Sequence, residues 1–129
     1  MDTGAFYALA DRRDPARLHS RTFFEGCSAM LTTTDFIFAE TMSLMTKRLG
    51  NAVAVAFGEG IRGSPMFRIE EPTEQVCEQA WTLFAGHRDK DFDLIDCISF
   101  ATMESLCIHD VFGFDRHFTQ YGFHLQPDR

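Results

Sequence analysis

The sequence contains no apolar run long enough to cross a bilayer. No continuous apolar stretch exceeds six residues, the length of the stretch at residues 52–57, whereas a membrane-spanning helix needs about 20 residues. The first residues, Met1 and Asp2, offer neither the basic region nor the apolar region of a signal peptide. These absences argue against a membrane protein and predict a cytoplasmic location.

Closely spaced cysteines are also missing. The four cysteines, Cys27, Cys77, Cys97 and Cys107, form no CxxC pair, and each lies among apolar residues. We therefore expect reduced thiols in the core of a protein that folds without a disulfide. Neither a Ser- or Gly-rich linker nor an internal repeat divides the chain, so residues 1–129 are expected to form a single domain.

An excess of basic charge is absent too. The chain has 12 Lys and Arg residues against 19 Asp and Glu residues, which gives a formal net charge of −7. This balance argues against a broadly basic face for nucleic acid, but it is compatible with several carboxylates that hold a divalent cation. His109, His117 and His124 match no metal-binding spacing, so we expect them to be structural or surface residues.

The sequence does contain clear helix boundary signals. Asp14, Thr34 and Asp93 are typical N-cap residues, and Gly50 is a typical helix end. Short apolar or β-branched segments lie between the helices. The expected helices cover residues 15–26, 35–49, 51–62, 73–86, 94–107 and 116–121, and the expected strands cover residues 30–33, 66–70, 110–114 and 123–125, after a first strand that ends at Asp2. This alternation predicts an α/β fold with a mostly parallel sheet covered on both faces.

Four acidic residues occupy informative positions in this pattern. Asp2 would end the first strand, and Asp115 directly follows a later strand. Glu40 lies about two turns into a helix, and Asp96 lies in the first turn of another. Ligands of parallel sheets bind beyond the carboxyl ends of the strands. We therefore expect these carboxylates to converge at one edge of the sheet.

Several motifs in the chain match one family. Residues 2–9 read Asp-Thr-Gly-Ala-Phe-Tyr-Ala-Leu, and Thr34 is followed after five residues by Glu40-Thr41. Residues 89–103 read Asp-Lys-Asp-Phe-Asp-Leu-Ile-Asp-Cys-Ile-Ser-Phe-Ala-Thr-Met, and residues 114–118 read Phe-Asp-Arg-His-Phe. In this order, and over nearly the whole chain, the sequence resembles PIN-domain proteins of the VapC type, which are toxin ribonucleases.

The resemblance implies a three-layer α/β/α sandwich that forms a homodimer and cuts RNA. By motif, Asp2, Glu40, Asp96 and Asp115 would be the catalytic and metal-binding residues. They would hold Mg²⁺ or Mn²⁺, which activates water for attack on the phosphodiester. Such a toxin pairs with a small antitoxin that inserts a segment, often carrying Arg, into the acidic pocket.

Further residues near the four acids have expected supporting roles. Thr3 and Ser99 could orient the carboxylates or hold water molecules that bind them. Asp93 stands where Ser is common in the family, and we expect it to cap a helix. One departure concerns the start of the chain, because a single residue precedes Asp2 where the family has several apolar ones. Either the first strand is shortened, or the start of the chain has been placed too late.

Three alternatives remain open from the sequence. The motif at residues 2–5, Asp-Thr-Gly-Ala, also occurs in retroviral-type aspartic proteases, but these need an all-β chain, which the helix signals contradict. A PIN fold could also serve as a binding module with little activity, and divalent-metal binding would separate this from a nuclease. Finally, the nuclease could process RNA outside a toxin–antitoxin pair.

Overall fold

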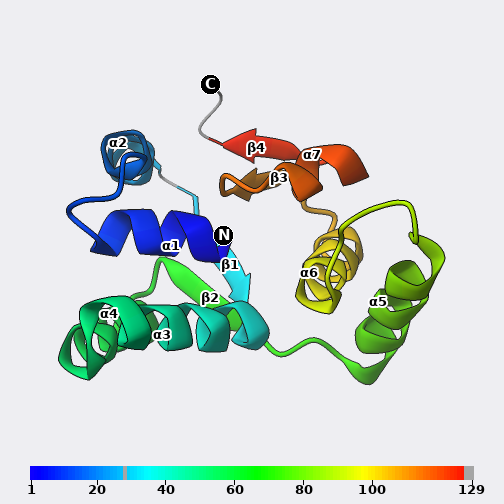
Figure 1. The fold of residues 1–129 in the computed structure, drawn as a ribbon, viewed down its shortest axis with the longest axis horizontal. Coiled ribbons are helices and arrows are strands. Elements are labelled where there is room, and N and C mark those ends of the chain that lie inside the picture. The colour runs from blue at the N-terminus through cyan, green and yellow to red at the C-terminus, as the bar shows by residue number, and fades with distance from the viewer. Residues whose placement is uncertain (28, 127–129) are drawn as a thin grey trace.

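The computed structural model describes residues 1–27 and 29–126 as alternating helices and short strands. In chain order the elements are α1 (Thr3–Ala10), α2 (Arg17–Gly26), β1 (Leu31–Thr34), α3 (Asp35–Leu49), α4 (Asn51–Gly63), β2 (Phe67–Glu70), α5 (Glu74–Gly86), α6 (Leu94–Ser105), β3 (Asp110–Phe112), α7 (Arg116–Tyr121) and β4 (His124–Gln126). Helices surround the strands (Figure 1). The predicted α/β class is confirmed, and the all-β alternative is wrong.

The strands form two parallel pairs instead of one continuous sheet. Strand β1 pairs with β2, and β3 pairs with β4. The amino terminus lies between the two pairs (Figure 1). There the Met1 amino group donates a hydrogen bond to the Thr32 carbonyl at 2.7 Å, and the Asp2 N–H donates to the Phe112 carbonyl at 2.9 Å. These two hydrogen bonds join the two halves of the molecule.

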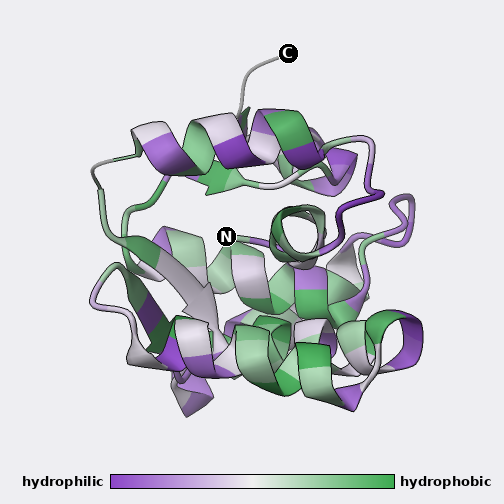
Figure 2. Ribbon diagram, turned by 90° about the vertical axis from the view of Figure 1, so that its left-hand side faces the viewer, coloured by the Kyte–Doolittle hydropathy of each residue, from purple (hydrophilic) through white to green (hydrophobic). Residues whose placement is uncertain are grey.

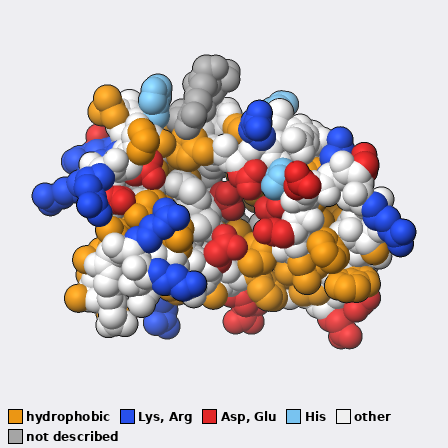
Figure 3. All heavy atoms as spheres, in the orientation of Figure 1, with side chains coloured by type: hydrophobic (Ala, Val, Ile, Leu, Met, Phe, Trp, Pro, Cys, Tyr) orange, Lys and Arg blue, Asp and Glu red, His pale blue; other side chains and the backbone are white. Residues whose placement is uncertain are grey.

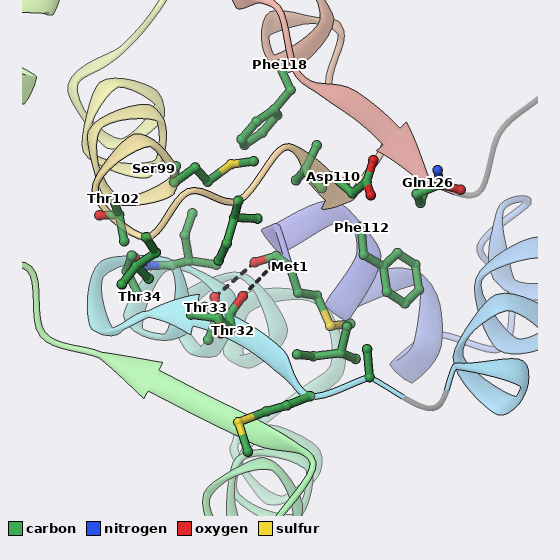
Figure 4. A pocket seen from close by; sticks show the side chains of 18 of the residues that line it. Met1, Thr32, Thr33, Thr34, Ser99, Thr102, Asp110, Phe112, Phe118 and Gln126 are labelled. Carbon is green, nitrogen blue, oxygen red and sulfur yellow. Dashed lines mark hydrogen bonds between the residues drawn. The ribbon is translucent and has the colours of Figure 1, made fainter.

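Met1 and Asp2 take the place of the first strand that the sequence predicted. Successive N–H groups of a strand point to opposite edges, and here they point to β1 and to β3. Two residues are too few for a regular strand. Among the described residues, the prediction of a first strand that ends at Asp2 is therefore wrong. A cavity of about 410 Å³ lies beside Met1 and separates β1 from β3 (Figure 4).

Local signals explain where most helices begin and end. The Thr34 side chain accepts a hydrogen bond from the Ile37 N–H, which caps α3, and Gly50 ends this helix with a φ of 92°. The predicted helix over residues 35–49 is therefore confirmed. Helix α2 begins later than predicted, because the Asp14 side chain accepts from the Ala16 N–H in a turn before the helix.

Two groups of buried side chains form the core. One group, including Phe6, Ile37 and Met45, lies between α1, α3 and α4. The other, which includes Phe100 and Phe118, lies between α5, α6, β3 and α7. Most helices carry both hydrophilic and hydrophobic residues along their length (Figure 2), as expected when one face packs against a core.

The cysteines only partly follow the expectation from the sequence. All four are free, as predicted. Cys97 is buried, but Cys27 and Cys77 are half-buried and Cys107 is exposed, so the expectation of four core thiols is wrong. Among the described helices, none combines the length and apolar content needed to cross a membrane.

We predict that Phe100→Ala destabilises the fold strongly. The Phe100 side chain is fully buried and packs against the rings of Phe92, Phe118 and Tyr121. Its removal leaves a cavity, so the free energy of unfolding in urea should fall by about 3–5 kcal/mol. Phe36→Ala is the matched control, because Phe36 is 40% exposed and its replacement should cost far less. Equal losses for the two variants would contradict this description of the core.

Candidate active site

Asp2 lies at the junction of the two strand pairs. Its backbone N–H is bound to Phe112, and the residue is the N-cap of α1. Its side chain makes no capping hydrogen bond, so the carboxylate is not used to start the helix. Gly113 allows the close approach of β3 to this segment, because a Cβ there would lie 3.0 Å from the Asp2 Cβ. Asp2 is thus held by its backbone, and its carboxylate is available for binding.

Asp96 is fixed in the first turn of α6 by a reciprocal capping arrangement. The Asp93 carboxylate accepts from the Asp96 N–H at 2.7 Å, and the Asp96 carboxylate accepts from the Asp93 N–H at 3.1 Å. Asp93 is therefore an N-cap residue, as predicted. This capping box uses one oxygen of Asp96 and restricts the orientation of its carboxylate.

Asp115 starts α7 just after the end of β3. As the N-cap residue, its carboxylate accepts from the His117 N–H at 2.9 Å. The Asp115 side chain remains 39% exposed. It therefore has access to solvent and to an incoming ligand, although one of its oxygens is already used by the helix cap.

The structure brings Asp2, Asp96 and Asp115 into one cluster. Acidic side chains gather around a hollow in the middle of one face, with a histidine among them (Figure 3). Burial raises the pKa of Asp2 to about 6, and the negative charges of Asp115 and Asp96 raise it further. Burial also raises the pKa of Asp96 to about 6, with added contributions from the charges of Asp93 and Asp115. The carboxylates therefore repel one another.

Glu40 is joined to this cluster through Thr3. The Thr3 hydroxyl donates to a carboxylate oxygen of Glu40 at 2.5 Å, and Thr3 follows Asp2 directly in the chain. Thr3 thus has the orienting contact that the sequence analysis expected of it. Ser99, the other expected supporting residue, lies one turn beyond Asp96 on α6 and lines the cavity beside Met1 (Figure 4).

His117 is the site residue that the sequence analysis missed. Its Nδ1 lies 2.9 Å from an Asp96 oxygen and 3.2 Å from an Asp115 oxygen. Ligand atoms of Asp96, Asp115 and His117 all lie within 4.8 Å of one another. The expectation of a structural or surface histidine did not anticipate these contacts, and whether His117 has a functional role stays untested. The signal was its place two residues after Asp115, in the first turn of a helix that Asp115 caps.

Comparison with known proteins identifies the family. A family model for the PIN domain matches residues 1–124. The chain belongs to the PIN domain family. Among curated proteins, this PIN domain is 29% identical over 123 residues to the 23S rRNA-specific endonuclease VapC20 of Mycobacterium tuberculosis, in an alignment that covers 95% of this chain and 93% of the relative. The predicted family is confirmed.

The similarity extends to the three-dimensional structure. The crystal structure of Mycobacterium tuberculosis VapC20, a sarcin-ricin loop cleaving toxin, superimposes on this PIN domain with a TM-score of 0.89. The two chains share 29% sequence identity, and the match covers 95% of this chain and 93% of the other. Similarity to a toxin endonuclease in both sequence and fold supports the predicted toxin ribonuclease function.

We predict that Asp96→Asn stabilises the metal-free PIN domain at neutral pH. The pKa of Asp96 is higher in the folded chain than its ordinary value of 3.8, so its ionisation opposes folding, and stability is lost as the pH rises from about 4 through about 6. Asn keeps the capping acceptor without the charge. With chelator present, the variant should gain roughly 1 kcal/mol at pH 7 after allowance for solvent screening.

Urea unfolding at several pH values measures this gain, which should shrink as the pH falls towards 4. Asp110→Asn is the control, because Asp110 is exposed and pairs with His124 at 3.6 Å outside the cluster. A stability gain of Asp96→Asn that does not change with pH would show that repulsion among the carboxylates is not its cause.

Proposed function

We propose that this PIN domain is a metal-dependent endoribonuclease, the toxin of a toxin–antitoxin pair, that acts in the cytoplasm. The residues that we assign to the reaction are Asp2, Glu40, Asp96 and Asp115. The observation that carries the proposal is the meeting of Asp2, Asp96 and Asp115, which come from three distant parts of the chain. The charges of Asp115 and Asp96 add to the raised pKa of Asp2, and the charge of Asp115 adds to that of Asp96. Such a group of carboxylates can hold a divalent metal, and a bound metal promotes the hydrolysis of a phosphodiester.

The donor set fits Mg²⁺ or Mn²⁺. Both ions accept carboxylate oxygens, and Mg²⁺ typically takes one or two carboxylates directly and keeps several waters. The raised pKa values of Asp2 and Asp96 also fit a metal site. Burial and neighbouring negative charges disfavour the ionised carboxylates, and a divalent cation would stabilise them. When bound, the metal supplies charge neutralisation at the phosphate and lowers the pKa of a bound water.

The protein residues have distinct roles in this proposal. Asp2, Asp96 and Asp115 hold the cation, either directly or through water. Thr3 positions Glu40, whose carboxylate can accept a proton from an attacking water or orient it. The Asp93 N–H keeps the Asp96 carboxylate in place through the capping box. These hydrogen bonds hold Glu40 and Asp96 in place before the substrate arrives. The site therefore needs less reorganisation to stabilise the transition state.

The RNA backbone would need cations outside the acidic cluster. Three arginines contact the carboxyl-terminal end of α1. The Arg48 guanidinium lies 5.2 Å from the centre of the Tyr7 ring, the Arg17 guanidinium donates to the Leu9 carbonyl at 3.1 Å, and Arg13 pairs with Asp11. Since Asp2 caps the other end of this helix, α1 connects the carboxylates to a basic surface that could hold phosphates.

The target and the partners follow by analogy with the relatives. VapC20 is specific for 23S rRNA, so a structured ribosomal RNA is the first substrate to test. We propose a small antitoxin whose Arg-bearing segment occupies the acidic hollow, because a guanidinium pairs well with carboxylates. A homodimer would cover exposed apolar side chains such as Trp81 and Phe84, which are 56% and 39% exposed on α5.

The central test is cleavage of RNA by matched variants. With Mn²⁺, the protein should cut total cellular RNA at few sites and leave 5′-phosphate and 3′-hydroxyl ends, and a chelator should stop the reaction. Asp96→Asn should lower the rate by roughly 100-fold or more, because it weakens metal binding. Asp110→Asn should retain activity. Undiminished cleavage by Asp96→Asn would contradict the proposed function.

A second prediction concerns the basic surface. Replacing Arg13 and Arg48 together by Ala should weaken RNA binding and reduce the dependence of the affinity on salt by about two phosphate contacts. Mn²⁺ affinity should not change, because neither residue belongs to the acidic cluster. Arg68→Ala serves as the control, since Arg68 lies on β2 and pairs with Glu70. If Arg68→Ala weakens RNA binding as much as the double variant does, the RNA backbone does not bind preferentially to the arginines beside α1.

A further inference from the structure

His117 stands out among the titratable groups because its ring joins two of the proposed metal ligands. Its Nδ1 approaches Asp96 at 2.9 Å and Asp115 at 3.2 Å. The three side chains offer two oxygens and one nitrogen, all within 4.8 Å of one another. A small cation placed among these atoms would therefore have a mixed set of ligands and not only carboxylates.

The position of the His117 ring is fixed by its surroundings. Its backbone N–H is bound by the Asp115 carboxylate at the start of α7. The ring packs edge-on against Phe92, with ring centres 5.5 Å apart and an interplanar angle of 81°. Phe92 is itself buried in the aromatic core, and the His117 side chain is only 26% exposed. A ring held in this way does not need to reorganise in order to bind a ligand.

Two roles are compatible with this position, and they predict opposite effects. As a metal ligand, the imidazole would strengthen the binding of a cation. As a protonated counter-ion between two carboxylates, it would occupy the place of the cation and weaken its binding. The nitrogen and the oxygens of Asp96 and Asp115 all lie within 4.8 Å of one another, so one cation among them could contact all three atoms once Nδ1 gives up its proton to solvent. This shared geometry fits the first role.

We propose that His117 is a nitrogen ligand of the metal and makes this site prefer Mn²⁺ over Mg²⁺. Imidazole nitrogen suits first-row transition ions such as Mn²⁺, whereas Mg²⁺ strongly prefers oxygen ligands and retained water. The assignment of His117 as a ligand rests on the proposed metal centre. It adds a residue that determines which ion this centre prefers. Asp2, Glu40, Asp96 and Asp115 alone would give an all-oxygen site without this preference.

The test measures metal binding and not catalysis. The wild-type protein, His117→Ala, His117→Asn and His124→Ala are titrated with Mn²⁺ and with Mg²⁺ at about pH 8, where an ordinary imidazole is neutral. His124 is the matched control, because it also lies beside an aspartate, Asp110, but outside the cluster. Circular dichroism verifies that each variant is folded, and His117→Asn replaces His117→Ala if the smaller side chain prevents folding.

The expected result is a change in the ratio of the two affinities. His117→Ala should lower the affinity for Mn²⁺ roughly tenfold or more relative to that for Mg²⁺, while His124→Ala leaves the ratio unchanged. Electron spin echo spectra of bound Mn²⁺ should show coupling to a histidine nitrogen in the wild-type protein and in His124→Ala, and this coupling should disappear in His117→Ala.

Each other outcome overturns the assignment. If Mn²⁺ binds with an unchanged ratio and without nitrogen coupling, His117 is not a ligand, but the carboxylate centre and the proposed nuclease stand. If His117→Ala raises the affinity for both ions, the ring is a counter-ion that competes with the metal. If the wild-type protein binds neither ion, the metal-dependent function and the His117 assignment fail together.

Discussion

The mutual repulsion of Asp2, Asp96 and Asp115 is the constraint on which the rest of this structure depends. Burial raises the pKa of Asp2 and of Asp96 to about 6, and the neighbouring negative charges add to both shifts. The fold holds the carboxylates together through local contacts. The Phe112 carbonyl binds the Asp2 N–H, the capping box of α6 orients Asp96, and Asp115 caps α7 by accepting from the His117 N–H. A divalent cation that binds these carboxylates would relieve the repulsion that remains. Its binding would therefore stabilise the folded protein.

The proposed site lies at the seam between the two core clusters. Asp2 and Glu40 belong to helices that pack around Phe6 and Ile37, whereas Asp96 and Asp115 start helices that pack around Phe100. The two halves are joined by the hydrogen bonds of Met1 and Asp2 and by the packing of the Phe23 ring against Phe112, and a cavity lies between them beside Met1. A bound cation would therefore add a link between the halves, so metal binding and the stability of the fold are coupled.

Signals carried by short segments predicted much of this fold. Thr34, Gly50 and Asp93 marked helix boundaries because capping depends on a few neighbouring atoms. The strand at Asp2 was not predicted correctly, because strand pairing depends on residues far apart in the chain. The proximity of His117 to Asp96 was missed for the same reason, since these residues lie 21 positions apart. The meeting of the acids was anticipated from the rule that ligands bind beyond the ends of parallel strands and from the resemblance to PIN domains, although the strands form two separate pairs.

The most direct test of the account is the release of protons when metal binds. Near pH 5.5, protons occupy a large part of Asp2 and Asp96 if their pKa values are about 6, and a cation held by these carboxylates must displace them. Addition of Mg²⁺ to the weakly buffered protein should therefore release protons at this pH and far fewer at pH 8, with a smaller release from Asp96→Asn. Binding of the cation without proton release at pH 5.5 would contradict the claim that the repelling carboxylates hold the metal.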